Sequence, residues 1–316
     1  MHHVADRLQT AIDRSGSIAC VGLDPRPALL PPSIRERKLA TFGPTGQAVA
    51  AAFVTFNLGI IDAVAGHCAA VKPQTACYEA YGSHGWAALA ETVRYATEAG
   101  LVVIADAKRG DIGSTASHYR DAFLGEAPGL DGEPVAGLGA DWLTVNPYLG
   151  SDNVTEFLDQ VPGGSGVFVL AKTSNPSSGE LQDRECEGET VAEVVARLIH
   201  GWGADRLGEH GLSDVGAVVG ATYPDEARLM RSIMPDSPFL VPGYGAQGGT
   251  AADCAKAFRA DGTGAVVNSS RGITFAFRSG AHAERFGEKR WRDSVAAGVY
   301  EMGDALAAAT GGPRAT

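Results

Sequence analysis

An apolar stretch runs directly into a group of charges in the segment LVVIADAKRGDIG (101–113). Asp106, Lys108, Arg109 and Asp111 follow within six positions, and charges beside a buried strand cost desolvation free energy unless they lie at its open end or do chemistry. Asp106 and Lys108 are two apart, so they share one face of a strand. Carboxylates of Asp106 and Asp111 on either side would keep the Lys108 ammonium protonated and oriented, as a proton donor to a carbanion requires. The alternative is a solvated charged turn.

A second group of residues combines glycines with one arginine. Its two segments are PGYGAQGG (242–249) and, after the next apolar stretch, NSSRG (268–272). Glycines let backbone N–H groups approach an anion closely, and Arg271 offers a fork of donors that suits phosphate oxygens. Together the two segments predict a phosphate site. The alternative is that the glycines only form tight turns.

Further polar residues follow other apolar stretches. Asp24, Lys72 and Asn146 each end one, and KTSNPSSG (172–179) follows another. Polar groups at the carboxyl ends of parallel strands are typical of active sites in α/β barrels. Two of these residues also have simpler interpretations. Lys72 could be a surface lysine with a buried apolar stem, and Asp24, before Pro25, could be a turn former.

The elements that must position these residues are eight short segments rich in Val, Ile, Leu and Ala. Most are continuously apolar, as strands buried on both faces of a parallel sheet should be. They span residues 17–24, 68–73, 101–106, 140–146, 166–172, 215–221, 238–243 and 264–270. Apolar residues at three- and four-residue steps predict helices at 46–67, 85–100, 188–211, 224–234, 250–262 and 281–308. Eight strand–helix units predict a single (β/α)8 TIM barrel, with a doubly wound open sheet as the alternative.

The rest of the chain predicts one domain. Residues 25–46 and 125–139 are rich in Pro and Gly and show no regular pattern, so we expect surface insertions there. The first residues (1–16) resemble a short amphipathic helix and not a signal peptide. No repeat or linker divides the sequence, which predicts one catalytic domain over residues 1–316.

Composition limits the partners. The net charge is −11, and no basic stripe is present to neutralise the phosphates of a nucleic acid. A small anion can still bind where a few cations are focused in one cleft. The five cysteines form no CxxC pair and the eight histidines show no metal-ligand spacing, so we expect free thiols, no metal and a cytoplasmic protein. No apolar run reaches the roughly 18–20 residues of a membrane span, so we expect no membrane partner.

With these residues in view, the sequence resembles the orotidine 5′-phosphate decarboxylase family, in particular its longer bacterial subgroup (type 2). DAKRGDIG together with PGxGAQGG is a highly specific pair, whereas either half alone is moderately specific. The motifs run in order over nearly the whole chain: VGLDPRP (21–27), VKPQTACYE (71–79), DAKRGDIGSTA (106–116), VNPYLG (145–150), KTSNPSSG (172–179), PGYGAQGG (242–249) and SSRGI (269–273).

The resemblance implies a reaction. The family removes CO2 from orotidine 5′-phosphate (OMP) to give UMP, in de novo pyrimidine biosynthesis, without metal or organic cofactor. By resemblance, Lys108 delivers the proton to C6 of the pyrimidine, Asp106 lies against the departing carboxylate, and Lys72 completes the charge network. No carbonyl is placed to delocalise the resulting carbanion, so its stabilisation must be electrostatic and preorganised.

The resemblance also implies substrate-binding residues and a partner chain. The binding residues contact ribose, pyrimidine or phosphate: Asp24 and Thr115 for ribose hydroxyls, Ser174 for the pyrimidine, and Gln247, Arg271 and backbone N–H groups near Gly245 and Ser270 for the phosphate. Thr115 and Asp111 would reach in from the neighbouring subunit, which implies at least a homodimer.

Two other functions are compatible with this pattern. The first is a Mg2+-dependent sugar-phosphate lyase or decarboxylase of the same superfamily, which shares DxKxxD. Such relatives carry an acidic metal ligand where this chain has Lys72, and a cation there should repel Mg2+. The second is a non-catalytic phosphate-binding barrel, because a fold does not fix a function.

Overall fold

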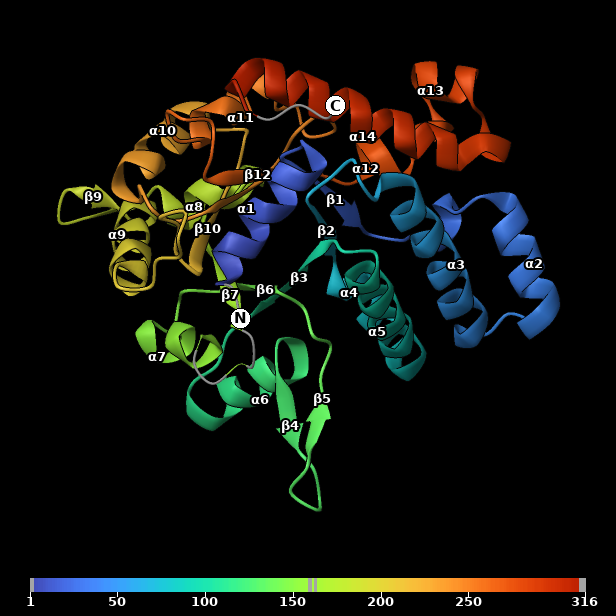
Figure 1. Cartoon of the computed structure of the whole chain (residues 1–316), viewed down its shortest axis with the longest axis horizontal. Coiled ribbons are helices and arrows are strands. Elements are labelled where there is room, and N and C mark those ends of the chain that lie inside the picture. The colour runs from blue at the N-terminus through green and yellow to red at the C-terminus, as the bar shows by residue number, and fades with distance from the viewer. Residues whose placement is uncertain (1–2, 159–160, 162–163, 313–316) are drawn as a thin grey trace.

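The computed structural model describes residues 3–158, 161 and 164–312, so both ends of the predicted 1–316 domain lie outside the described residues. Eight parallel strands form a closed barrel in the order β1-β12-β11-β10-β7-β6-β3-β2, surrounded by helices (Figure 1). They are β1 (Ala19–Leu23), β2 (Ala70–Pro73), β3 (Val102–Arg109), β6 (Trp142–Val145), β7 (Gly166–Lys172), β10 (Val215–Val219), β11 (Phe239–Pro242) and β12 (Ala265–Ser269).

The predicted TIM barrel is confirmed. Each barrel strand overlaps one of the eight predicted segments. The open-sheet alternative is wrong, because β1 pairs with β12 on one side and with β2 on the other, which closes the sheet. The strands are buried along nearly their whole length, as their continuous apolar sequences require.

The helices pack outside the strands. They are α1 (Val4–Ser15), α2 (Pro32–Phe42), α3 (Gly46–Val64), α4 (Thr75–Glu79), α5 (Gly82–Glu98), α6 (Gly113–Phe123), α7 (Ser151–Val154), α8 (Gly179–Gln182), α9 (Val191–Gly203), α10 (Pro224–Ile233), α11 (Ala251–Cys254), α12 (Arg271–Thr274), α13 (Gly280–Arg285) and α14 (Trp291–Thr310). Local signals set several ends. Thr190 and Glu193 form a reciprocal capping box at the start of α9, and Gly16 ends α1 in the left-handed conformation.

Several helix predictions need correction. The helix predicted at 281–308 is divided, because Gly287 adopts φ +58° between α13 and α14. The helix predicted at 250–262 is only α11 followed by a 3₁₀ turn at Ala255–Ala257. Helix α6 was not predicted, since its buried side chains are only Ala116 and Phe123 and leave little apolar periodicity in the sequence.

Both segments without a sequence pattern contain regular structure. Residues 25–46 include α2, which buries only Ile34 and therefore lacks an apolar stripe. Residues 125–139 form a hairpin of β4 (Glu126–Pro128) and β5 (Pro134–Ala136) that projects from the body (Figure 1). A further hairpin, β8 (Glu185–Cys186) with β9 (Glu189–Thr190), precedes α9. The strands of these hairpins have only two or three residues, too few to show an alternating pattern.

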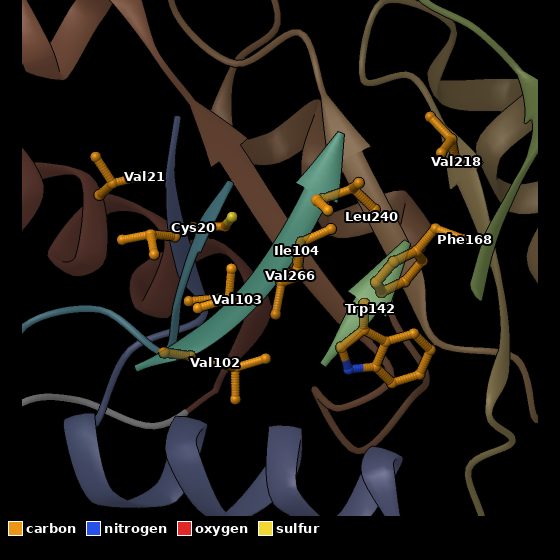
Figure 2. Close-up of a cluster of buried hydrophobic side chains, with 14 of the residues drawn as sticks. Cys20, Val21, Val102, Val103, Ile104, Trp142, Phe168, Val218, Leu240 and Val266 are labelled. Atoms are coloured by element: carbon orange, nitrogen blue, oxygen red, sulfur yellow. The ribbon is translucent and has the colours of Figure 1, made fainter. Parts of the chain in front are cut away.

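Large side chains fill the interior of the barrel on the side where the strands begin. Trp142 on β6 and Phe168 on β7 stack with ring centroids 4.5 Å apart, in a cluster with Ile104, Val266 and Leu240 (Figure 2). Gly166 makes room for them, because a Cβ there would lie 2.4 Å from the Trp142 ring. The interior below the strand ends is therefore a packed core and not a channel.

Helix α3 is long and apolar enough to cross a membrane by length and composition, contrary to the expectation that no run qualifies. Its Phe53, Phe56 and Ile60 are buried, and the helix packs against α2, α5 and α14. Core helices of folded barrels pass the same test, so the pattern of α3 follows from its place in this barrel.

Candidate active site

Three charged side chains form a chain of ion pairs at the carboxyl ends of β2 and β3. Lys72 Nζ lies 2.6 Å from Asp106 Oδ2, and Lys108 Nζ lies 2.5 Å from Asp106 Oδ1. Asp106 and Lys108 lie on the same side of β3, as predicted, since their side chains form an ion pair. The simpler interpretation of Lys72 as a surface lysine is wrong, because its side chain is only 6% exposed.

The network fixes the charge of its buried members. Burial alone would raise the pKa of Asp106, but Lys72 and then Lys108 outweigh it and hold that pKa well below its usual range. Burial alone would lower the pKa of Lys72, but Asp106 and then Asp24 raise it above its usual value. Both groups are therefore ionised at neutral pH.

The two lysines differ in their access to solvent. The Lys108 side chain is 47% exposed, although it binds the same carboxylate as buried Lys72. Its backbone adopts φ +49°, and among the described non-glycine residues only Glu187 shares a positive φ. Lys108 thus presents an ammonium to the opening of the barrel from a strained backbone conformation.

The structure does not bring Asp111 to Lys108 within one chain. The expected cage with a carboxylate on each side has only its Asp106 half among the described residues. The Asp111 N–H donates to Asn153 Oδ1, and its carboxylate accepts from the Ile112 N–H. Gly110 and Asp111 lead the chain away from β3 toward α6, so the Asp111 side chain does not return to Lys108. Thr115 lies exposed on α6.

A cavity of about 630 Å³ opens above the network. It brings together most of the predicted site residues from separate strands of the barrel. Leu170, Val218 and Leu240 form part of its apolar floor. The predicted residues that line it are Asp24, Lys72, Asp106, Lys108, Ser174, Gln247, Ser270 and Arg271, whereas Asp111, Thr115 and Gly245 are not among its lining residues.

The cavity contains a cationic side chain whose N–H donors are free to bind a ligand. Arg271 begins α12 and is exposed to the cavity, and its guanidinium forms no ion pair within the described residues. In the same cavity, Gln247 Oε1 accepts a 2.9 Å hydrogen bond from Ser174 Oγ, which joins the loops after β7 and β11. The Gly245 N–H already donates to the Gly249 carbonyl, so it stabilises the turn while Ala246 and Gln247 line the cavity.

Another wall presents an open acceptor. Asp24 follows β1 and its Oδ2 accepts a 2.5 Å hydrogen bond from Ser270 Oγ. Its Oδ1 is buried and has no hydrogen-bond partner within the described residues. A buried carboxylate oxygen left unpaired is costly, so this atom fits a hydroxyl donated by a ligand better than it fits a turn.

Sequence reasoning missed three residues of the site. Gln74 Nε2 donates to Asp106 Oδ2 at 3.0 Å, and Thr144 Oγ1 donates to Asp106 Oδ1 at 3.0 Å. Asn268 on β12 lines the cavity, and its Oδ1 is buried without a partner in the described chain. All three are neutral, so charge did not single them out. Their positions at strand ends were the available signal.

The comparisons with known proteins agree with this arrangement. The family model described as Orotidine 5′-phosphate decarboxylase / HUMPS family matches residues 19–286. An orotidine 5′-phosphate decarboxylase of Rhodopirellula baltica is 46% identical over 96% of this chain and 98% of its own. One of Haloarcula marismortui is 45% identical over 87% of each chain.

A solved structure gives the same result in three dimensions. The structure of Leishmania donovani OMP decarboxylase matches with a TM-score of 0.73 and 32% identity, over 98% of this chain and 99% of that one. Sequence, fold and strand-end chemistry therefore lead to one conclusion: this chain is a member of the orotidine 5′-phosphate decarboxylase / HUMPS family.

Proposed function

We propose that this protein decarboxylates orotidine 5′-phosphate to UMP and CO2, in de novo pyrimidine biosynthesis and without a cofactor. The observation that carries the proposal is the Lys72–Asp106–Lys108 network, which lies in the same cavity as Arg271. A decarboxylase needs a fixed charge pattern at the reacting carbon and a separate grip on the phosphate. The cavity offers both.

The nucleotide binds in an extended arrangement across the cavity. Its phosphate accepts hydrogen bonds from Arg271, Gln247 and backbone N–H groups near Gly245 and Ser270, as the resemblance implies. On the first loop these are the N–H groups of Ala246 and Gln247, because the N–H of Gly245 itself donates to the Gly249 carbonyl. A ribose hydroxyl donates to the open Oδ1 of Asp24. Ser174 contacts the pyrimidine, and the phosphate end supplies binding energy that holds the ring against the charged network.

The chemistry is one bond broken and one bond formed. The bond between C6 and the carboxylate carbon breaks, the electron pair stays on C6, and CO2 leaves beside Asp106. The Lys108 ammonium stabilises the negative charge on C6 and then transfers a proton to it, which gives UMP. Solvent returns a proton to Lys108, which is exposed enough to receive it. Lys72 keeps Asp106 ionised and in place throughout.

A second chain completes each site. Asp111 and Thr115 do not line the cavity of their own chain; after β3, Asp111 is half-buried and Thr115 is exposed. In a homodimer they reach the partner's site, where Asp111 supplies the second carboxylate for Lys108 and Thr115 contacts ribose. We place this dimer in the cytoplasm, in keeping with five cysteines that are all free.

The two alternative functions have less support. A Mg2+-dependent lyase needs clustered oxygen ligands, whereas Asp106 is already bound by two ammonium groups, and the described residues hold no group of three potential His, Cys, Asp or Glu ligands. A barrel that only bound phosphate would not need a buried charge network that ends in a lysine with a strained backbone.

The test follows OMP absorbance with purified protein in buffer containing EDTA. We expect steady conversion to UMP, a loss of several orders of magnitude in Lys108→Ala, and normal activity in the control Lys256→Ala, which removes an exposed lysine elsewhere. Activity abolished by EDTA and restored by Mg2+ would favour the lyase. UMP binding without OMP conversion would favour the non-catalytic barrel.

A further inference from the structure

Thr144 on β6 lies opposite an irregularity in strand β3. Strand β3 pairs with β6 through Ala105 with Leu143 and then Arg109 with Val145, with a register shift between the two pairs. Three residues of β3, 106–108, thus lie opposite the single residue Thr144. This bulge contains Asp106 and Lys108, which both line the cavity, and backbone groups in a bulge lose their regular partners.

The Thr144 hydroxyl replaces one of those lost partners. Thr144 Oγ1 accepts a 2.9 Å hydrogen bond from the Lys108 N–H and donates a 3.0 Å hydrogen bond to Asp106 Oδ1. The direction of both bonds is fixed, because an N–H can only donate and an ionised carboxylate can only accept. The residue is 1% exposed, so water does not compete for either bond.

The bond to the Lys108 N–H acts where the backbone is strained. A lysine at φ +49° costs about 1–2 kcal/mol relative to an ordinary conformation. Such a conformation persists only where its surroundings hold it. Thr144 is the side chain that binds this peptide group, and it binds the carboxylate to which Lys108 Nζ is paired as well.

We propose that Thr144 is a positioning residue for the decarboxylation, an inference that rests on the proposed function. One hydroxyl sets the orientation of the Asp106 carboxylate and the backbone from which Lys108 extends, so the acid and the proton donor keep a fixed relation. Thr144 is not among the residues that line the cavity, so it acts through these two groups. Its loss should lower turnover far more than substrate affinity.

The experiment compares Thr144→Val, which keeps the shape and removes the hydroxyl, with Thr144→Ser, which keeps the hydroxyl. Thr92→Val is the matched control: Thr92 is fully buried, and its hydroxyl accepts from Asn57 and donates to the Ala88 carbonyl, so neither bond involves Asp106 or Lys108. The readouts are kcat and KM for OMP, the Kd of UMP, thermal stability, and hydrogen exchange of the Lys108 amide by NMR of lysine-labelled protein.

We expect kcat to fall about 10- to 100-fold in Thr144→Val, with KM and the UMP Kd within about 3-fold of wild type. Thr144→Ser should restore most of kcat, Thr92→Val should leave it nearly unchanged, and the Lys108 amide should exchange faster only in Thr144→Val. A kcat in Thr144→Val equal to that of Thr92→Val overturns the proposal. So does a UMP Kd that weakens as much as kcat falls.

The amide measurement separates this inference from the proposed function. If the wild-type protein does not convert OMP, the proposed function fails, and exchange of the Lys108 amide then tests the geometry by itself. An amide that exchanges equally fast in wild type and Thr144→Val means that the hydroxyl does not hold the bulge, and the inference fails with it.

Discussion

Asp106 is bound by two lysines that have different tasks. Lys72 is buried on β2, and its positive charge offsets the free-energy cost of burying the Asp106 carboxylate in the barrel. Lys108 reaches the same carboxylate from the cavity side and stays accessible to a ligand. Because buried Lys72 already compensates the charge of Asp106, the exposed Lys108 remains available for the proton transfer proposed above.

Strain at Lys108 predicts an unusual order of stability between two variants. At φ +49° an alanine keeps the unfavourable contact of its Cβ, whereas a glycine does not. We expect Lys108→Gly to be more stable than Lys108→Ala by about 1 kcal/mol, although glycine usually destabilises a strand. Urea unfolding of both inactive variants measures the difference. An alanine variant that is the more stable of the two would mean that the backbone at 108 is relaxed.

Asp106→Asn should reveal the pH range in which the network stabilises the fold. The folded-state pKa of Asp106 is depressed, because Lys72 and Lys108 together outweigh burial. Its stabilisation is therefore complete above the unfolded pKa of about 4 and is lost as pH falls toward the folded value. We expect the variant to lose about 3–5 kcal/mol of unfolding free energy at neutral pH, because Lys72 is left buried and unpaired.

This loss should become smaller below about pH 4, where Asp106 takes up a proton in the unfolded chain but stays ionised in the folded protein, so the wild type loses stability. Denaturant unfolding of wild type and Asp106→Asn from neutral pH to about pH 3 measures it. A gap between the two proteins that does not change with pH would show that the carboxylate charge is not what stabilises the fold.

At the scale of elements, the sequence predicted those strands and helices whose positions are set by the burial of apolar side chains. The eight barrel strands are short and apolar on both faces, so each could be located from composition alone. Helices α2 and α6 bury few side chains, and their polar sequences gave no periodic signal. Site residues divide in the same way: Asp106 and Lys108 were found by their charge and Lys72 by the family resemblance, whereas Thr144 and Gln74 matter through register and contacts that no single stretch of sequence records.

The turn that begins α12 should govern affinity for the phosphate. Arg271→Ala removes a charged donor from one end of the cavity and leaves the Asp106 network intact. A charged hydrogen bond of about 1.5–3 kcal/mol corresponds to a rise in KM of about 10- to 100-fold. We expect a smaller change in kcat, and no effect from the control Arg228→Ala, which truncates an exposed arginine on α10. An unaltered KM for OMP in Arg271→Ala would place the phosphate elsewhere.

At the scale of the whole molecule, the overall charge and the site charge have opposite signs. The protein carries a net charge of −11, yet Arg26, Lys72, Lys108 and Arg271 line one cavity. Focusing of the field by low-dielectric walls lets such a cluster attract a nucleotide despite the acidic exterior. The acidic composition therefore argues against a nucleic acid as a partner, but it does not argue against a small phosphate ester.

A shared site predicts complementation between inactive chains. Mixing Lys108→Ala with Asp111→Ala should produce heterodimers in which one of the two sites has both residues intact. Random exchange makes half of the dimers mixed, so we expect up to about a quarter of wild-type activity. Each variant alone is the control, and affinity tags report the exchange. If mixed dimers form and activity does not return, each site is built from a single chain.

The stacked rings of Trp142 and Phe168 have a consequence for traffic through the enzyme. They fill the barrel on the side where the strands begin. The nucleotide therefore enters, and both products leave, through the opening at the carboxyl ends of the strands. In the proposed reaction, CO2 forms at the deep end of the cavity while the phosphate still anchors the nucleotide. We therefore expect ordered product release, in which CO2 leaves the cavity first and UMP leaves last.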